Sequence, residues 1–192
     1  YFIDANGHLR HVRFGEGEYA RSEAIIRTLL MEAGATNLPS PAGGAEAEGA
    51  MAPDSGADRS PETYLGTDRG MNLAATPADL AVDHWALDGD WRREPQRSVL
   101  AGPTGAISYR FRGRDVHLVL ASTTDRPVRF RVTLDGRVPG AAAGSDLNAA
   151  GEGVITGQRL YQLIRLPDGP GQGTLRIEFL DPGAAAYAFT FG

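Results

Sequence analysis

Cysteine, the residue type that carries thiol chemistry, does not occur in this sequence. None of the 192 residues is a cysteine. A thiolate is the nucleophile of disulfide exchange and a good ligand for soft metals, and paired cysteines are needed for a disulfide framework. All three kinds of chemistry are therefore excluded within these residues, and we predict no catalytic residue among them.

The four histidines are the next candidates for chemistry. His8 and His11 flank a predicted hairpin turn, but no third metal ligand is near them in the sequence. A zinc site needs at least three protein ligands, so we expect both side chains to be solvated. His84 and His117 stand singly, and we expect them to be structural or exposed. We predict neither a metal site nor a cofactor.

Three carboxylates near Trp91 superficially resemble an acid–base cluster. Asp88, Asp90 and Glu94 lie within seven residues of one another along the chain. Hydrolytic chemistry needs two carboxyl groups at a defined separation across a substrate, and nothing in the spacing supplies that separation. We expect these residues to form a polar loop.

Aromatic side chains are the best candidates for a binding site, because a flat ring next to hydrogen-bonding groups can stack on a sugar. The aromatic candidates are Tyr64, Trp91 and Tyr161, and Arg159 and Asp135 are the polar groups that would accompany them. Aromatic residues of a small β-sandwich are more often part of its core. That alternative is favoured for Trp85 and stays open for Trp91.

The charge of the chain argues against a nucleic-acid partner. All 19 basic residues are arginines, and 24 acidic residues give a formal net charge of −5. Nucleic-acid-binding proteins need a positively charged surface. Four arginines alternate with apolar residues, and we expect them to form a solvated sheet face with acidic partners across the strands: Arg110, Arg112, Arg129 and Arg131. A surface that binds an acidic partner is the less favoured alternative.

The segment 105–136 predicts three consecutive strands, because apolar and polar residues alternate along it. The apolar positions are Ile107, Tyr109, Phe111, Val116, Leu118, Leu120, Val128, Phe130, Val132 and Leu134. This period of two is typical of an antiparallel sheet with one buried face. Further strands are expected at 160–166, 175–180 and 187–191, whereas the segment before residue 105 looks irregular. We predict a mainly β fold, a jelly-roll-like antiparallel sandwich of two sheets.

The first 34 residues have a different pattern. Asp4-Ala5-Asn6-Gly7 predicts a hairpin turn between a strand at 1–3 and a strand at 9–14, and apolar residues spaced by three and four predict a helix over 18–33. A hairpin and one helix cannot bury an apolar face alone. We therefore expect residues 1–34 to be part of a domain, 35–59 a flexible linker, and 60–192 the sandwich.

Two regions resemble a known family. Residues 1–10 (YFIDANGHLR) and 14–19 (FGEGEY) resemble the C-terminal hairpin and helix of extracytoplasmic thioredoxin-like redoxins. Residues 60–192 are similar to the sandwich module, carbohydrate-binding-module-like, that follows the redoxin in DipZ-type cytochrome c biogenesis proteins. The matching stretches are 60–66 (SPETYLG), 114–120 (RDVHLVL), 159–164 (RLYQLI), 178–183 (EFLDPG) and 186–192 (AYAFTFG).

The resemblance implies a larger, extracytoplasmic parent protein. In that family a membrane-embedded electron conduit precedes the redoxin, and a Cys-x-x-Cys pair and a cis-proline carry out the disulfide exchange. Those residues match nothing in this chain, which begins at Tyr1 without a signal peptide or a membrane-spanning pattern and is expected to be a fragment or a processed product. The expected partners are the redoxin domain, the conduit, and a glycan or client polypeptide. The alternatives are a purely structural or dimerising sandwich and a stand-alone glycan-binding module.

Overall fold

The computed structural model describes residues 1–12, 19–41 and 59–192. It consists of two compact units, Tyr1–Pro53 and Asp54–Gly192, which are described separately below. Most of the predicted linker, residues 42–58, lies outside the described residues. Its described part, residues 35–41 and residue 59, contains no helix or strand.

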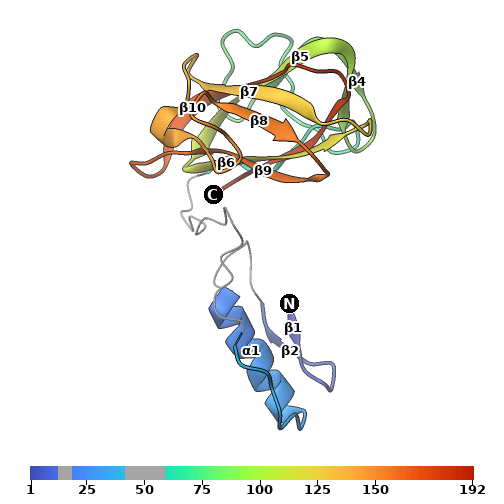
Figure 1. Ribbon diagram of the computed structural model, residues 1–192, viewed down its shortest axis with the longest axis vertical. Coiled ribbons are helices and arrows are strands. Elements are labelled where there is room, and N and C mark those ends of the chain that lie inside the picture. The colour runs from blue at the N-terminus through green and yellow to red at the C-terminus, as the bar shows by residue number, and fades with distance from the viewer. Residues whose placement is uncertain (13–18, 42–58) are drawn as a thin grey trace. The chain divides into compact units, whose positions relative to one another are not determined.

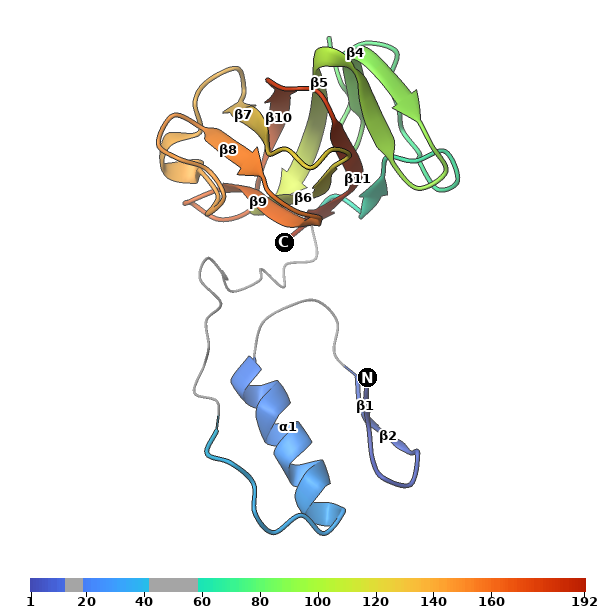
Figure 2. The same ribbon diagram turned by 45° about the vertical axis from the view of Figure 1, so that its right-hand side comes forward.

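The second unit is built from antiparallel strands, as the sequence predicted. The strands are β3 (Thr63–Tyr64), β4 (Trp85–Arg93), β5 (Ser98–Gly113), β6 (Asp115–Ser122), β7 (Val128–Leu134), β8 (Glu152–Ile155), β9 (Arg159–Arg165), β10 (Gly171–Phe179) and β11 (Ala184–Phe191), with a short 3₁₀ turn at Gly140–Ala142. Every pairing between these strands is antiparallel. The jelly-roll-like, mainly β fold is therefore confirmed (Figures 1 and 2).

The two layers of the sandwich belong to one continuous, curled sheet. Its strand order is β8-β7-β10-β5-β11-β6-β9, with β4 on β5 and β3 on β11. Strand β5 joins the layers, because its residues 105–113 pair with β10 whereas Ser98 and Val99 pair with β11. The long strand β5 lets the sheet curl back on itself, as Figure 2 shows.

The inner face of this sheet forms one core. On β7, Val128, Phe130 and Val132 are at most 1% exposed, while Arg129 and Arg131 between them face the solvent. The same alternation buries the other large side chains of the core, which are Trp85, Tyr109, Phe111, Tyr161, Phe179 and Phe189. Burial of aromatic and aliphatic side chains supplies most of the free energy that stabilises a fold of this kind.

The segment before residue 105 is more regular than the sequence indicated. Strand β4 was missed because its centre, Asp88-Gly89-Asp90, looks like a turn, whereas in the structure it is a bulge between residues 89 and 91. Gly89 has a φ of +97°, which a glycine adopts without strain. The first half of β5 was missed because Gly102-Pro103-Thr104-Gly105 also resembles a turn; the strand instead runs through it.

Two ends of the sandwich can be distinguished. At one end, which we call the linker end, the Ser60 backbone N–H donates to the Arg112 carbonyl and the Ser60 hydroxyl contacts Asp83 Oδ1 at 2.5 Å. Gly192 lies at the same end, where its carbonyl accepts from Arg114 and Asp115. The opposite end, which we call the loop end, carries the β4–β5, β6–β7, β8–β9 and β10–β11 connections.

The first unit contains the predicted hairpin and helix. Strands β1 (Phe2–Ile3) and β2 (Leu9–His11) are joined by a turn in which Gly7 has a φ of +83° and the Asp4 carboxylate accepts from the Asn6 N–H at 2.9 Å. Helix α1 spans Tyr19–Glu32. Gly34 follows the end of the helix; its φ is +93°, and its N–H bonds the Met31 carbonyl. Phe14 and Glu18, the predicted ends of the second strand and of the helix, lie outside the described residues.

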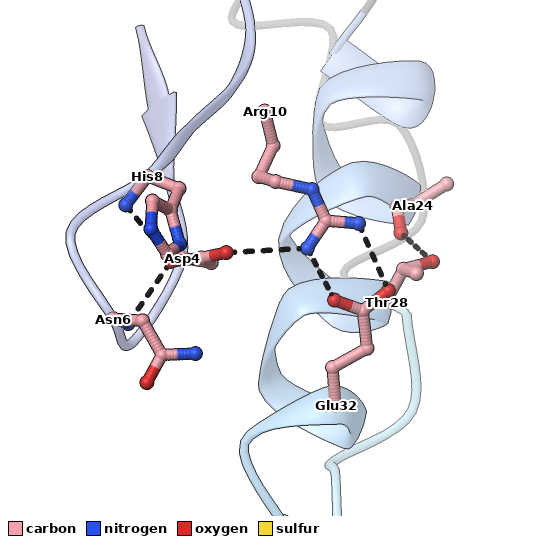
Figure 3. Close-up of polar contacts among 7 residues, drawn as sticks. All are labelled: Asp4, Asn6, His8, Arg10, Ala24, Thr28 and Glu32. Atoms are coloured by element: carbon pink, nitrogen blue, oxygen red, sulfur yellow. Dashed lines mark hydrogen bonds and ion pairs between the residues drawn. The ribbon is translucent and has the colours of Figure 1, made fainter.

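Arg10 connects the hairpin to the helix. Its guanidinium contacts Glu32 at 2.6 and 3.3 Å and Asp4 at 3.3 Å (Figure 3). The hydrogen bond to Glu32 is the largest cause of the raised pKa of Arg10, while the backbone N–H of His8 is the main cause of the lowered pKa of Asp4. These contacts are exposed, so each contributes little to stability.

The apolar side chains of the first unit are mostly uncovered. Ile3, Leu9, Ile26, Leu30 and Met31 are each 44% exposed or more. Residues on both the hairpin and the helix therefore lack apolar neighbours within the described part of this unit. Among the described residues, no helix is both long enough and apolar enough to span a membrane.

Candidate functional site

The aromatic residues predicted to bind a ligand do not form a common platform. Tyr161 on β9 is fully buried, and its ring meets Phe130 edge-on at 6.1 Å. Its hydroxyl accepts hydrogen bonds from the N–H groups of Thr156 and Gly157 and donates to the Gly157 carbonyl. Tyr161 is thus a core residue that holds the β8–β9 connection, and its ring has no free face for a sugar.

Tyr64 and Trp91 are half-buried and are held by separate contacts. The Arg69 guanidinium lies 3.6 Å from the centre of the Tyr64 ring and covers one of its faces. A hydrogen bond to Glu62 is the first cause of the raised pKa of Tyr64. Trp91 packs edge-on against Phe179 at 5.6 Å. Trp85 is fully buried, which confirms its interpretation as a core residue.

The two polar candidates, Asp135 and Arg159, already bond other groups of the sandwich. Asp135 follows β7 at the linker end with a φ of +49°, and its carboxylate accepts from the Thr174 N–H at 2.8 Å. Arg159 begins β9 at the loop end, where it pairs with Asp146 at 2.5 Å and lies 3.7 Å from the Tyr161 ring centre. Of the five predicted residues, only Arg159 and Tyr161 contact each other.

Three of the four strand arginines pair with carboxylates, whereas the fourth, Arg110, donates to the Leu80 carbonyl at 3.3 Å. Arg131 on β7 pairs with Glu152 directly across on β8 at 2.9 Å, and Arg112 pairs with Asp83 at 3.0 Å. Arg129 binds Asp181 at 2.8 Å, which lowers the pKa of Asp181 to about 2. The acidic partners that the sequence predicted are therefore present for Arg112, Arg129 and Arg131, but Asp83 and Asp181 belong to connections and not to a neighbouring strand.

The other polar candidates are dispersed. Asp88 belongs to β4 and pairs with Arg176 at 2.7 Å, whereas Glu94 pairs with Arg92 and Arg97 at 2.7 Å each. These carboxylates are therefore bound to arginines. Within the part of the chain that the structure describes, no group of three or more histidine or carboxylate side chains could hold a metal ion.

A hollow of about 340 Å³ lies instead at the loop end, and we call it the loop-end groove. It is formed by four segments that are distant in the sequence but adjacent in the sheet. These are Arg97 in the β4–β5 turn, residues 121–122 and 124–127 around the β6–β7 loop, residues 156–158 between β8 and β9, and Tyr187 on β11. Most of the side chains that line the groove are polar.

The walls of the loop-end groove are fixed by hydrogen bonds. The Ser122 hydroxyl lies 2.8 Å from the carbonyls of both Thr124 and Arg126, which holds the β6–β7 loop. The hydroxyl of Tyr161 accepts from the N–H groups of Thr156 and Gly157 and so fixes another part of the lining. Arg97 donates to the Tyr187 hydroxyl at 3.2 Å and to Glu94 at 2.7 Å, and the bond to Glu94 is the first cause of the raised pKa of Arg97.

A second hollow of about 480 Å³ is lined by the same loop. Residues 124–127 line both hollows, and Asp181 and Pro182 complete the second one. The β6–β7 loop therefore borders two recesses at this end of the sandwich. Sequence reasoning did not find this site, because its residues come together only through the strand order; the polar run Ser122-Thr123-Thr124-Asp125-Arg126 was its only local signal.

Comparison with known proteins identifies relatives of the sandwich. The profile of the family "Thioredoxin like C-terminal domain" matches residues 60–192. Protein DipZ of Mycobacterium bovis and Protein DipZ of Mycobacterium tuberculosis are each 32% identical to this chain over 136 residues, which is 64% of the chain. The match covers 19% of the length of each of these relatives.

Solved structures are similar only at a distance. A family two carbohydrate esterase from Cellvibrio japonicus has a TM-score of 0.45 and 10% identity, over 67% of this chain and 31% of the esterase. A family two carbohydrate esterase from Clostridium thermocellum, in complex with cellohexaose, has a TM-score of 0.41 and 14% identity, over 56% and 31%. Similarities this low support no conclusion about a ligand of this chain.

Proposed function

Because this chain belongs to the thioredoxin-like C-terminal domain family through residues 60–192, we propose that it is the non-catalytic C-terminal part of a DipZ-type thiol–disulfide oxidoreductase. In this proposal the sandwich is an accessory binding domain for the polypeptides on which the redoxin acts. The parent is extracytoplasmic and tethered to the membrane by a segment outside this chain. The redoxin domain and a membrane electron conduit are its partners.

The observation that carries this proposal is the family match together with the absence of cysteine. Disulfide exchange needs a thiolate, and none of the 192 residues can supply one. A contribution of the sandwich to the reaction must therefore come through binding or through stabilisation of its neighbour. Tethering a binding domain next to an active site raises the local concentration of a client without any new chemistry.

A polar recess at the loop end supports binding over a purely structural role. An obligate structural interface usually exposes a broad apolar patch when its partner is absent. The exposed large apolar residues of the described sandwich are few: Met71, Leu73, Val138 and Val154. They come from three separate loops and strands. The loop-end groove, in contrast, is a concave surface with fixed walls.

Deletion of residues 60–192 from the intact parent protein tests the proposal. We expect kcat/KM for a disulfide-containing polypeptide client to fall by about tenfold, because the effective concentration gained by tethering is lost. Reduction of oxidised glutathione, which is too small to need an accessory domain, should be unchanged. An equal loss with both substrates would show that the sandwich only stabilises the redoxin, and the structural alternative would replace this proposal.

A further inference from the structure

One arginine of the loop-end groove has no partner for its charge in the part of the chain that the structure describes. Arg126 is exposed, and no described residue makes a hydrogen bond or an ion pair with its guanidinium. Other exposed arginines of the sandwich, such as Arg129 and Arg131, are paired with carboxylates. The loop that carries Arg126 is nevertheless ordered by the Ser122 hydroxyl, so the guanidinium extends from a fixed backbone.

We propose that the loop-end groove binds a carboxylate side chain of an extended polypeptide, and that Arg126 is the residue that meets it. The inference rests on the proposed binding role of the sandwich and names the site and the ligand chemistry. A guanidinium offers two parallel N–H donors that match the two oxygens of a carboxylate. Arg97 adds a second positive charge to the wall, although Glu94 shares it.

The lining of the groove favours a peptide over a sugar. Tyr187 is the only aromatic residue that lines it, and its hydroxyl is already bound by Arg97. The Arg97 guanidinium also lies 6.0 Å from the ring centre. A sugar-binding site needs a free ring face. Thr124, Thr156 and Gln158 supply hydroxyl and amide groups that can bond the backbone of an extended chain.

The negative net charge of the chain means that an acidic peptide can bind only at a locally positive site. The chain has a formal net charge of −5, so a general electrostatic field repels an acidic peptide. Any affinity must come from a local positive site. Asp125 lies next to Arg126, lines the same groove and opposes an acidic ligand. We therefore expect opposite effects on the affinity for an acidic peptide when the charge of Arg126 or that of Asp125 is removed.

The test is a titration of the whole ¹⁵N-labelled chain with a short peptide of alternating glutamate and glycine, followed by NMR. We expect amide shifts at residues 122–126 and 156–158. Arg126→Gln should weaken binding by about tenfold, which is a typical loss for one charge-assisted contact. Asp125→Asn should strengthen it. The matched control is Arg137→Gln, since Arg137 is also exposed, lies at the linker end, and has no side-chain partner among the described residues.

Three outcomes would overturn the assignment. The first is an equal loss of affinity in Arg126→Gln and Arg137→Gln. The second is equal binding of a peptide of alternating glutamine and glycine. The third is tighter binding of polygalacturonate, which would make the ligand an acidic glycan. If the peptide does not bind at the groove, the deletion of residues 60–192 from the parent can still lower client turnover, because clients could bind elsewhere on the sandwich. Conversely, binding at the groove combined with a non-selective deletion effect would contradict only the proposed role in client turnover.

Discussion

A buried phenol connects the core of the sandwich to the wall of the loop-end groove. The ring of Tyr161 fills the core beside Phe130, while its hydroxyl holds the Thr156 and Gly157 backbone at 3.0 and 3.3 Å. The tyrosine was predicted as a sugar platform because its type suits stacking. Because the ring is buried, Tyr161 cannot stack on a ligand. Its hydroxyl instead holds in place the loop that a ligand would contact.

Replacement of this hydroxyl should loosen the loop without emptying the core. Tyr161→Phe keeps the ring but removes the partner of two N–H groups, and we expect it to lower the free energy of unfolding by about 1–2 kcal/mol. Urea unfolding measures this loss, and hydrogen exchange at Gly157 should accelerate. Tyr64→Phe is the control, because its half-buried hydroxyl bonds the side chain of the exposed Glu62, which water can solvate, and not a buried backbone group; its cost should stay below about 0.5 kcal/mol. Similar costs for the two variants would contradict this role.

The ion pair between Asp181 and Arg129 predicts a dependence of stability on pH. The Asp181 carboxylate accepts from the side chain and backbone N–H of Arg129, and its pKa is lowered from 3.8 to about 2. A depressed pKa in the folded state contributes stability that is present above pH 3.8 and is lost as the pH falls toward 2.

Asp181→Asn should therefore destabilise the protein more at pH 6 than at pH 3. The measurement is chemical unfolding of wild type and variant at pH 6, 4 and 3. The control is Asp125→Asn, whose carboxylate has no bonded partner among the described residues, and it should change stability little at each pH. A difference between wild type and Asp181→Asn that stayed constant across this range would argue against the ion pair.

At the level of elements, the bend in the β4–β5 hairpin determines how the sheet curls. Next to the bulge in β4, Gly105 packs closely against the side chains of Trp91 and Leu100. A Cβ atom at Gly105 would lie 2.6 Å from Leu100 Cδ1 and 3.0 Å from the Asp88 carbonyl oxygen. Both distances are shorter than van der Waals contact.

Gly105→Ala should therefore destabilise the sandwich by about 1–3 kcal/mol through overpacking. Thermal or urea unfolding measures the effect. Gly102→Ala is the matched control on the same strand, because a Cβ there would be 3.4 Å from Asp90 Cβ, an ordinary contact distance. The second variant should be close to neutral. A neutral Gly105→Ala would mean that the hairpin shifts easily and does not fix the curl.

Strands with strict alternation could be predicted from the sequence, and strands with internal glycines could not. In β7, Val128, Phe130 and Val132 alternate with arginines, and the period of two alone identifies the buried face. In β4 and the first half of β5, the local residues favour turns, and pairing with neighbouring strands overrides that preference. The loop-end groove depends on strand order, which no local pattern encodes.

At the level of the whole molecule, the two units differ in how well they cover their apolar residues. The described sandwich has a closed core in which Phe111, Phe130, Phe179 and Phe189 are fully buried. The first unit leaves Ile3 58% and Leu9 55% exposed. Its best-defined tertiary contact is the Arg10–Glu32 pair, whose two side chains are 39% and 46% exposed. A pair as exposed as this contributes little to stability, and often nothing.

Residues 1–34 should therefore have little independent stability, whereas residues 60–192 should unfold cooperatively. Hydrogen exchange of the whole chain measures both, since it reports the opening of each segment separately. We expect amides of helix α1 to exchange almost as fast as those of an unfolded peptide, because a helix of 14 residues is marginal in water without tertiary packing. Amides of β5, β7 and β10 should exchange only through global unfolding. Arg10→Gln should leave the exchange of α1 unchanged, because the pair that it removes is too weak to hold the helix. Protection of α1 equal to that of β7 would show that the first unit has found an apolar partner, and the prediction would then be wrong.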